Sequence, residues 1–175
     1  MNDARVLLIG GRAGVGKTTV AWEISELLKS REVPHAVIEG DFMGQVHPAP
    51  ADDQDRSRIT ERNLTAVWGN FAELGYRRLI YMNSASVLPE AAGMFERAMG
   101  AGVRVVRVLL TASDGTTRSR LVGRELGSGL EAEYRKSVRR ARQLEDRAVT
   151  GTVRVATDGR TVPDIAAEVL TVTGW

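Results

Sequence analysis

Apolar and polar positions along the chain follow two patterns that alternate. Short apolar runs predict strands at residues 4–9, 34–39, 78–82, 103–110 and 152–156. Apolar residues spaced three and four apart predict amphipathic helices at 18–30, 59–74, 89–99, 116–126, 131–149 and 162–170. Strands that alternate with helices predict an α/β fold, in which a five-stranded, mainly parallel sheet lies between two helical layers as a three-layer sandwich.

The region between the second and third predicted strands combines a long loop with a helix. Residues 40–55 are rich in Gly, Pro and Asp, and a loop of this length is typically functional or disordered. In the helix that follows, which ends near residue 75, we expect Trp68 to belong to the core. The expected apolar stripe comprises Ile59, Ala66, Val67, Phe71 and Leu74.

Composition narrows the class of protein. The chain has 175 residues, 43% of them hydrophobic, with 24 Lys and Arg against 22 Asp and Glu, which predicts a single globular domain over residues 1–175. It has no Cys, so thiol nucleophiles and Cys-ligated metal sites are excluded. No apolar run is long enough for a membrane span or resembles a signal peptide, so we expect a cytoplasmic protein without a membrane partner.

Residues 11–18 read GRAGVGKT and match the phosphate-binding motif G-x-x-x-x-G-K-[ST] at every fixed position. The motif lies between a predicted strand and a predicted helix, where backbone N–H groups and the helix dipole can hold phosphate oxygens. We expect Lys17 to contact the β- and γ-phosphates and Thr18 to ligate Mg²⁺. The alternative is a glycine-rich turn with an incidental lysine. The expected nucleotide-binding residues here are Gly11, Ala13, Gly14, Val15, Gly16, Lys17, Thr18 and Thr19.

A carboxylate that could serve an acceptor follows the second predicted strand. Asp41 comes directly after Glu39 and Gly40, and the carboxyl ends of parallel strands line the ligand crevice of such sheets. Asp41 could therefore accept the proton of an acceptor hydroxyl as a general base, whereas Glu39, on the strand itself, is the weaker candidate. The alternative for Asp41 is a turn or helix cap. The third predicted strand is followed by Asn83 instead of an acidic residue, which counts against an NTPase that activates water.

On these residues the chain resembles the small P-loop kinases of the gluconate kinase, adenylylsulfate kinase and chloramphenicol phosphotransferase type. Residues 11–18 match their phosphate loop, residues 40–42 are similar to their acidic acceptor motif, and residues 83–86 are similar to the serine-containing turn of gluconate kinases. The resemblance implies a P-loop NTPase fold with a helical lid, ATP and Mg²⁺ as cofactors, and transfer of the γ-phosphoryl group to a small-molecule hydroxyl activated by Asp41.

The same resemblance implies an acceptor region at about 41–75 and an Arg-rich lid at about 113–149. The R-x-x-x-R spacing puts Arg120 and Arg124 on one helix face. By resemblance, Arg120 lies against the adenine and Arg124 reaches the transferring phosphoryl group, as a catalytic residue beside Asp41 and Lys17. Arg160, in the loop after the last strand, would cover the adenine ring. A solvated basic helix face and a plain turn are the alternatives.

Other functions stay open at this point. A nucleotide-binding regulator or adapter would need the phosphate-binding motif but no acceptor base. A nucleic-acid-hydroxyl kinase would suit the cations at residues 135–142, but an aromatic content of 5% and interleaved acids argue against a nucleic-acid partner. Arg58 and Arg62, at helical spacing beside the long loop, could bind an anionic substrate or form a solvent-exposed face.

Overall fold

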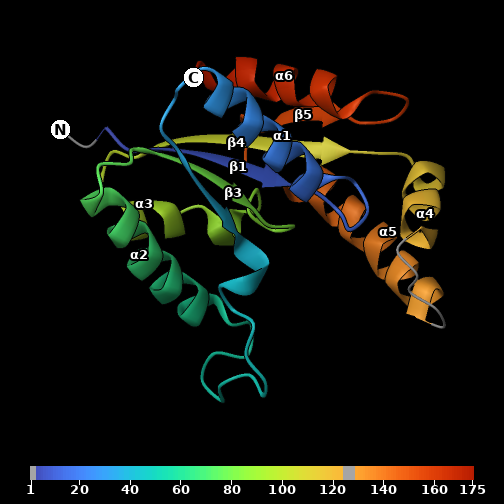
Figure 1. The fold of residues 1–175 in the computed structure, drawn as a ribbon. Helices are drawn as coiled ribbons and strands as arrows, with labels where there is room; N and C mark the ends of the chain where they lie inside the picture. Colours follow the sequence, from blue (N-terminus) through green and yellow to red (C-terminus); the bar gives the residue numbers. More distant parts are fainter. Residues whose placement is uncertain (1–2, 124–128) are drawn as a thin grey trace.

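The computed structural model describes residues 3–123 and 129–175, which are built around a five-stranded sheet (Figure 1). The strands are β1 (Arg5–Gly10), β2 (Ala36–Glu39), β3 (Arg78–Met82), β4 (Arg104–Thr111) and β5 (Val153–Ala156). They lie in the order β2-β3-β1-β4-β5, and each neighbouring pair is parallel. The predicted α/β fold is therefore confirmed, and the sheet is parallel throughout. All five strands end at the same edge, where ligands bind in sheets of this kind.

Two helical layers cover the sheet. The helices are α1 (Lys17–Ser30), α2 (Ser57–Glu73), α3 (Met94–Met99), α4 (Asp114–Val122), α5 (Leu130–Arg147) and α6 (Val162–Thr173), with 3-10 turns η1 (Gly40–Phe42) and η2 (Pro89–Ala91). Figure 1 shows α1 and α6 on one face, α2 and α3 on the other, and α4 and α5 projecting beyond one end of the sheet. In the part of the chain that the structure describes, no helix is long and apolar enough to cross a membrane.

The central strand β1 supplies both halves of the core. Leu7 and Ile9 pack into the cluster beneath α1 and α6, whereas Val6 and Leu8 pack into the cluster beneath α2 and α3. All four side chains are fully buried, because successive residues of a strand point to opposite faces and both faces are covered. This continuous apolar run is why the strand could be recognised in the sequence.

The buried face of α2 differs from the predicted stripe. Leu64 and Trp68 are buried against the sheet, as expected for Trp68, but Ala66 and Leu74 are exposed, so their assignment to the core was wrong. Residues two apart on a helix point to nearly opposite sides, so burial of Leu64 and Trp68 turns Ala66 outward. Leu74 lies beyond the last helical turn.

The helix predicted at 89–99 is also shorter than expected. The segment forms the turn η2 and then the short helix α3, with Gly93 just before the start of α3. Glycine inside a helix is unfavourable by about 1 kcal/mol relative to alanine, which favours a break in the helix at this point.

Candidate active site

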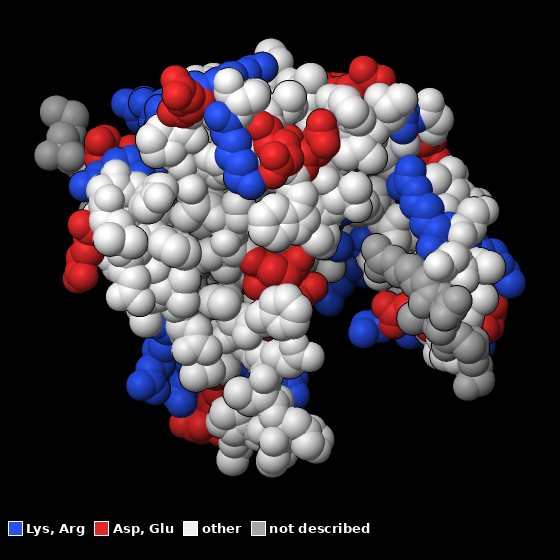
Figure 2. All heavy atoms as spheres, in the orientation of Figure 1, with Lys and Arg blue, Asp and Glu red and all other residues white. Residues whose placement is uncertain are grey.

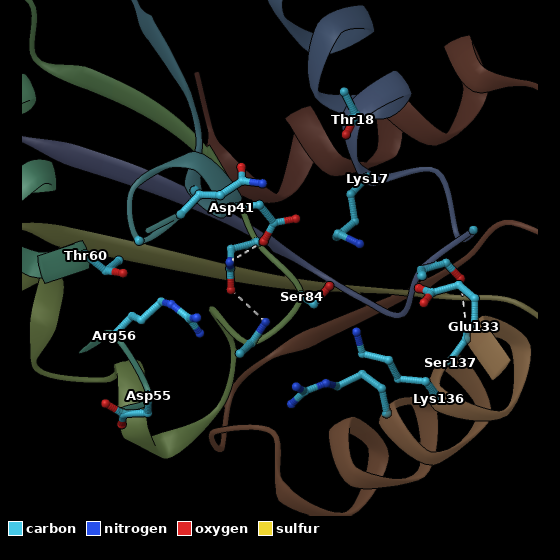
Figure 3. Close-up of a pocket in the computed structure, with 18 of the residues that line it drawn as sticks. Lys17, Thr18, Asp41, Asp55, Arg56, Thr60, Ser84, Glu133, Lys136 and Ser137 are labelled. Carbon is cyan, nitrogen blue, oxygen red and sulfur yellow. Dashed lines mark hydrogen bonds between the residues drawn. The ribbon is translucent and has the colours of Figure 1, made fainter. Parts of the chain in front are cut away.

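A cavity of about 750 Å³ lies at the carboxyl edge of the sheet. Its walls come from the phosphate-binding loop (residues 11–18), the segment after β2, the start of α2, the turn after β3, and α5. Figure 2 shows a hollow between two projections of the surface, one formed by α2 and the loop before it, the other by α4 and α5. Figure 3 shows the side chains that face this cavity, Lys17, Asp41 and Lys136 among them.

The phosphate-binding loop has the backbone of an anion cradle. Gly11, Gly14 and Gly16 adopt φ values of 146°, 83° and 104°, in the region that favours glycine. A Cβ at Gly11 would lie 2.9 Å from the carbonyl oxygen of Leu110, whereas one at Gly16 would meet no atom within 4 Å. Gly16 lines the cavity, and α1 begins directly after it without a side-chain cap. The first N–H groups of α1 are therefore available to a phosphate, as the motif predicts.

Side chains from distant elements hold the carbonyl groups of this loop. The Ser137 hydroxyl on α5 donates to the Ala13 carbonyl at 2.9 Å. Arg120 on α4 donates from Nη1 to the Val15 carbonyl at 3.0 Å, and also to the side chain of Thr157 at 3.0 Å. Because the carbonyl and N–H of a peptide point in opposite directions, these bonds fix the orientation of the loop's N–H groups. Arg120 thus joins the phosphate-binding loop to the loop after β5.

The oxygen atoms beside Lys17 suit a hard metal ion. The Thr18 hydroxyl donates to Oε2 of Glu39 at 3.0 Å, which leaves its lone pairs available to a metal. Burial raises the pKa of Glu39 above its usual range, and the nearby Asp41 carboxylate acts in the same direction, while the Thr18 hydrogen bond opposes both. Hydroxyl and carboxylate oxygens are the ligands that Mg²⁺ prefers. Among the described residues no cluster of three His, Cys, Asp or Glu could hold a metal alone, so a magnesium site here would need phosphate oxygens as well.

Asn83 orients the candidate base. Its Nδ2 donates to Oδ1 of Asp41 at 2.6 Å, and its Oδ1 accepts from the backbone N–H of Ala85 at 2.8 Å. Both ends of the amide are therefore engaged, and Oδ2 of Asp41 has no hydrogen bond from the described residues. Asn83, which follows β3 in place of an acidic residue, thus positions the Asp41 carboxylate, which follows the neighbouring strand β2.

Gly40 allows this approach of Asp41 to Asn83. A Cβ at Gly40 would lie 2.3 Å from the ring of Tyr81, which is 1% exposed and packs edge-on against Phe95. Burial, together with the charges of Asp41 and Glu39, raises the pKa of the Tyr81 hydroxyl, so it stays neutral. The ring of Tyr81 is thus a rigid support beneath the turn that carries Asp41.

Two cationic side chains of α5 line the cavity, and sequence reasoning did not single them out for this role. Lys136 and Arg140 line the cavity, and Figure 3 shows Lys136 extending toward the space that Lys17 faces from the other side. Lys136 and Arg140 are four residues apart and therefore lie on the same side of α5. Ser137, next to Lys136, binds the phosphate-binding loop, so this spacing is the sequence signal that could have indicated their position. Arg124 lies outside the described residues.

Two further residues that were predicted to bind the nucleotide, Thr19 and Arg160, do not line this cavity. Thr19 is exposed on the first turn of α1 and does not line this cavity. Arg160 donates to the carbonyl of Ala156 and pairs with Glu168 on α6 at 2.7 Å, so an adenine contact would have to coexist with these bonds.

No family model matches the sequence, and no curated protein matches it either. The structure, by contrast, superposes on solved structures over almost its whole length. The fold is that of the small P-loop kinases. A gluconokinase from Sinorhizobium meliloti 1021 is 18% identical, with a TM-score of 0.63 over 99% of this chain and 94% of that chain.

Two other neighbours agree. The tunicamycin resistance protein of Deinococcus radiodurans is 20% identical, with a TM-score of 0.69 over 98% of this chain and 96% of that chain. The APS kinase of Mycobacterium tuberculosis, solved with AMPPNP and APS, is 19% identical, with a TM-score of 0.59 over 98% of each chain. The predicted resemblance to small P-loop kinases is thereby confirmed at the level of the fold.

Proposed function

We propose that this protein is an ATP-dependent kinase that transfers the γ-phosphoryl group to a hydroxyl of a small molecule. The observation that carries the proposal is the position of Asp41, which lines the same cavity as Lys17 and is oriented by Asn83. A nucleotide-binding regulator would need the phosphate-binding loop but no oriented carboxylate opposite it. The solved neighbours, which include a gluconokinase and an APS kinase, support the same assignment.

We assign the nucleotide to the side of the cavity that is formed by the phosphate-binding loop and by the oxygen atoms of Thr18 and Glu39. When bound, MgATP supplies the phosphoryl group, and the metal neutralises charge on the phosphates. The loop N–H groups and Lys17 would hold the β- and γ-phosphates, and Thr18 with Glu39 would hold the metal. We further propose that residues 113–149 form the lid, and that Arg120 and Arg160 contact the base. The contact of Arg124 with the transferring phosphoryl group stays a prediction.

The acceptor side would be formed by residues 41–75, within a single domain. The acceptor oxygen forms a bond to the γ-phosphorus while the bond from that phosphorus to the β,γ-bridging oxygen breaks, which yields a phosphate monoester and ADP. The acceptor proton passes to Oδ2 of Asp41, the oxygen that Asn83 leaves unpaired. Lys136 and Arg140 line the cavity from α5 and would stabilise the charge of the transition state.

The test is an Asp41→Asn variant with Asp52→Asn as its matched control, since Asp52 is an exposed acid of the following loop. Wild-type protein is incubated with MgATP and a panel of hydroxyl compounds, and phosphate-monoester product and ADP are quantified. We expect Asp41→Asn to lower kcat by about 100- to 10,000-fold, with MgADP affinity unchanged. Unchanged turnover in the variant would contradict the role of Asp41. Tight ATP binding without turnover of any compound would favour a regulator instead.

A further inference from the structure

The charged residues of the loop before α2 have very different surroundings. Each acid of the run already accepts a hydrogen bond: Asp52 from Arg58 at 2.6 Å, Asp53 from the backbone N–H of Ile59 at 2.9 Å, and Asp55 from that of Ser57 at 3.1 Å. Asp53 is 5% exposed and caps the start of α2, which anchors the loop to the helix. The acids therefore serve to build the loop.

Arg56, the next residue, is different. Its Nε donates to the carbonyl of Val46 at 3.1 Å, and its two Nη groups have no hydrogen bond or ion pair among the described residues. Arg56 lines the cavity, and Figure 3 shows its guanidinium directed into it, while the Asp55 carboxylate points away. Arg56 is half-buried as a residue, and a guanidinium whose two end donors are unpaired can bind an oxyanion.

The backbone at Arg56 supports this interpretation. Arg56 has a φ of 60°, and among the described residues it shares positive φ only with Glu32 and glycines. A non-glycine residue in this region costs on the order of 1 kcal/mol, and such residues gather at ligand-binding sites. The conformation ends the loop and starts α2 at the next residue, so it sets the direction in which the Arg56 side chain leaves the backbone.

The arginines noted in the sequence as possible anion contacts do not take this position. Arg58 pairs with Asp52, and both side chains are mostly exposed; Arg62 is exposed further along α2. Neither lines the cavity. Only tertiary structure distinguishes Arg56 from them.

We propose that Arg56 binds a carboxylate of the acceptor, so that the substrate is a hydroxylated carboxylic acid. This inference rests on the proposed function. Asp41 takes the hydroxyl and Arg56 the carboxylate, and Thr60 and Gln45 line the same cavity. A carboxylate fits the two Nη donors side by side. A phosphate group would bring nearly two negative charges to a wall in which the single guanidinium of Arg56 lies in the same cavity as the Asp41 carboxylate.

The experiment compares hydroxy acids of three to seven carbons with their primary amides, the matching alditols and the matching sugar phosphates, all with MgATP. We expect turnover of hydroxy acids and little turnover of the uncharged compounds. Arg56→Gln should raise KM for the best acid by about 10- to 100-fold, with a much smaller change in kcat. Arg58→Gln, which removes the same charge two residues away, should leave KM within about two-fold. Circular dichroism and MgADP binding report that both variants are folded.

The other outcomes contradict either the carboxylate assignment alone or the proposed kinase function as well. Equal turnover of acids and amides, or an unchanged KM in Arg56→Gln, overturns the carboxylate assignment while the kinase assignment stands. Preference for sugar phosphates over the acids also overturns it. Bound MgATP with no turnover of any compound overturns the proposed function, and the inference with it.

Discussion

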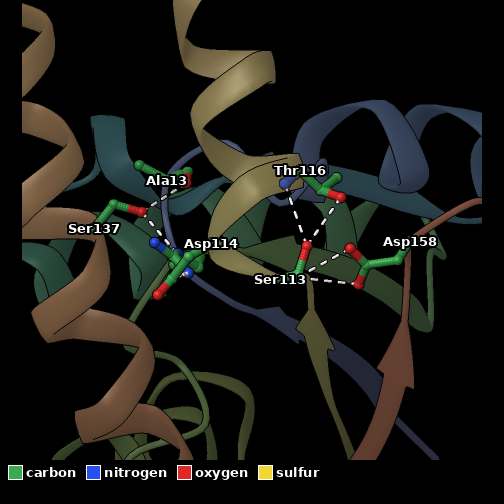
Figure 4. A network of polar contacts seen from close by, with 7 residues as sticks. Ala13, Ser113, Asp114, Thr116, Ser137 and Asp158 are labelled. Atoms are coloured by element: carbon green, nitrogen blue, oxygen red, sulfur yellow. Dashed lines mark hydrogen bonds and ion pairs between the residues drawn. The ribbon is translucent and has the colours of Figure 1, made fainter.

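Arg12 and Ser137 join the phosphate-binding loop to α5. The Arg12 side chain is 3% exposed, and its Nε donates to Oγ of Ser137 at 2.8 Å, while that hydroxyl donates to the carbonyl of Ala13 at 2.9 Å (Figure 4). The same guanidinium pairs with Asp114 at the start of α4. One buried arginine therefore attaches both α4 and α5 to the loop that would hold the phosphates.

Removal of the Ser137 hydroxyl should weaken this attachment. Ser137 is 2% exposed, so Ser137→Ala leaves the Arg12 Nε and the Ala13 carbonyl without this buried partner. We expect the free energy of unfolding to fall by about 1–3 kcal/mol, and the affinity for MgADP to fall with it, because the loop carbonyl loses its support. Urea unfolding and nucleotide titration measure the two effects. Ser119→Ala, on the exposed side of α4, is the control, and equal behaviour of the two variants would refute the coupling.

A methyl group at Gly40 should disturb both packing and the candidate base. In Gly40→Ala the new Cβ would overlap the buried ring of Tyr81, and the turn carrying Asp41 would have to shift. We expect a loss of about 1–3 kcal/mol in unfolding free energy and a lower kcat with little change in MgADP binding. Gly69→Ala is the matched control, because a Cβ there meets no atom within 4 Å and alanine favours the helix. A Gly40→Ala variant as stable and active as Gly69→Ala would disprove the constraint.

Asp158 should make stability depend on pH in the acid range. The Thr116 hydroxyl, the Ser113 hydroxyl and the Ser113 N–H lower the pKa of Asp158 to about 2. Figure 4 shows the Ser113 N–H, which donates to both oxygens of this carboxylate at 3.0 Å. Since the pKa in the unfolded chain is about 3.9, the carboxylate stabilises the fold above pH ~4, and this contribution is lost as the pH falls toward ~2.

The corresponding measurement is urea unfolding of the wild type and Asp158→Asn between pH 2 and 7. We expect the stability difference between them to be largest at neutral pH and to close as the pH falls through the range from about 4 to 2. Thr116→Val, which removes the strongest of the donors, should show part of the same loss. A difference that stays constant over this range would contradict the assignment.

Local patterns were enough to predict the loop geometry of residues 11–18 between β1 and α1. The glycines, Lys17 and Thr18 are contiguous, and a loop between a strand and a helix forms from neighbouring residues, so its geometry follows from sequence alone. Asp41 was predictable for a related reason, because the ends of parallel strands share one edge of the sheet. The pairing of Asp41 with Asn83 was not predicted, because it depends on which strands are neighbours in the sheet.

Packing decided which side chains of α2 and α5 face the cavity or the core. Ser137 binds Ala13 across 124 residues of sequence, and the rotation of α5 about its axis then determines that Lys136 and Arg140 face the cavity. In the same way, burial of Leu64 and Trp68 turned α2 away from the predicted stripe.

The sequence by itself determined the alternating α/β architecture, the phosphate-binding loop and the acid at the end of the second strand, because each depends on local spacing. Only the tertiary structure brought Arg56, and not Arg58, into the wall of the cavity and placed Lys136 and Arg140 of α5 in the same cavity as Lys17. The physical reason is that periodicity sets which residues share a face of an element, whereas the direction of that face depends on non-local packing.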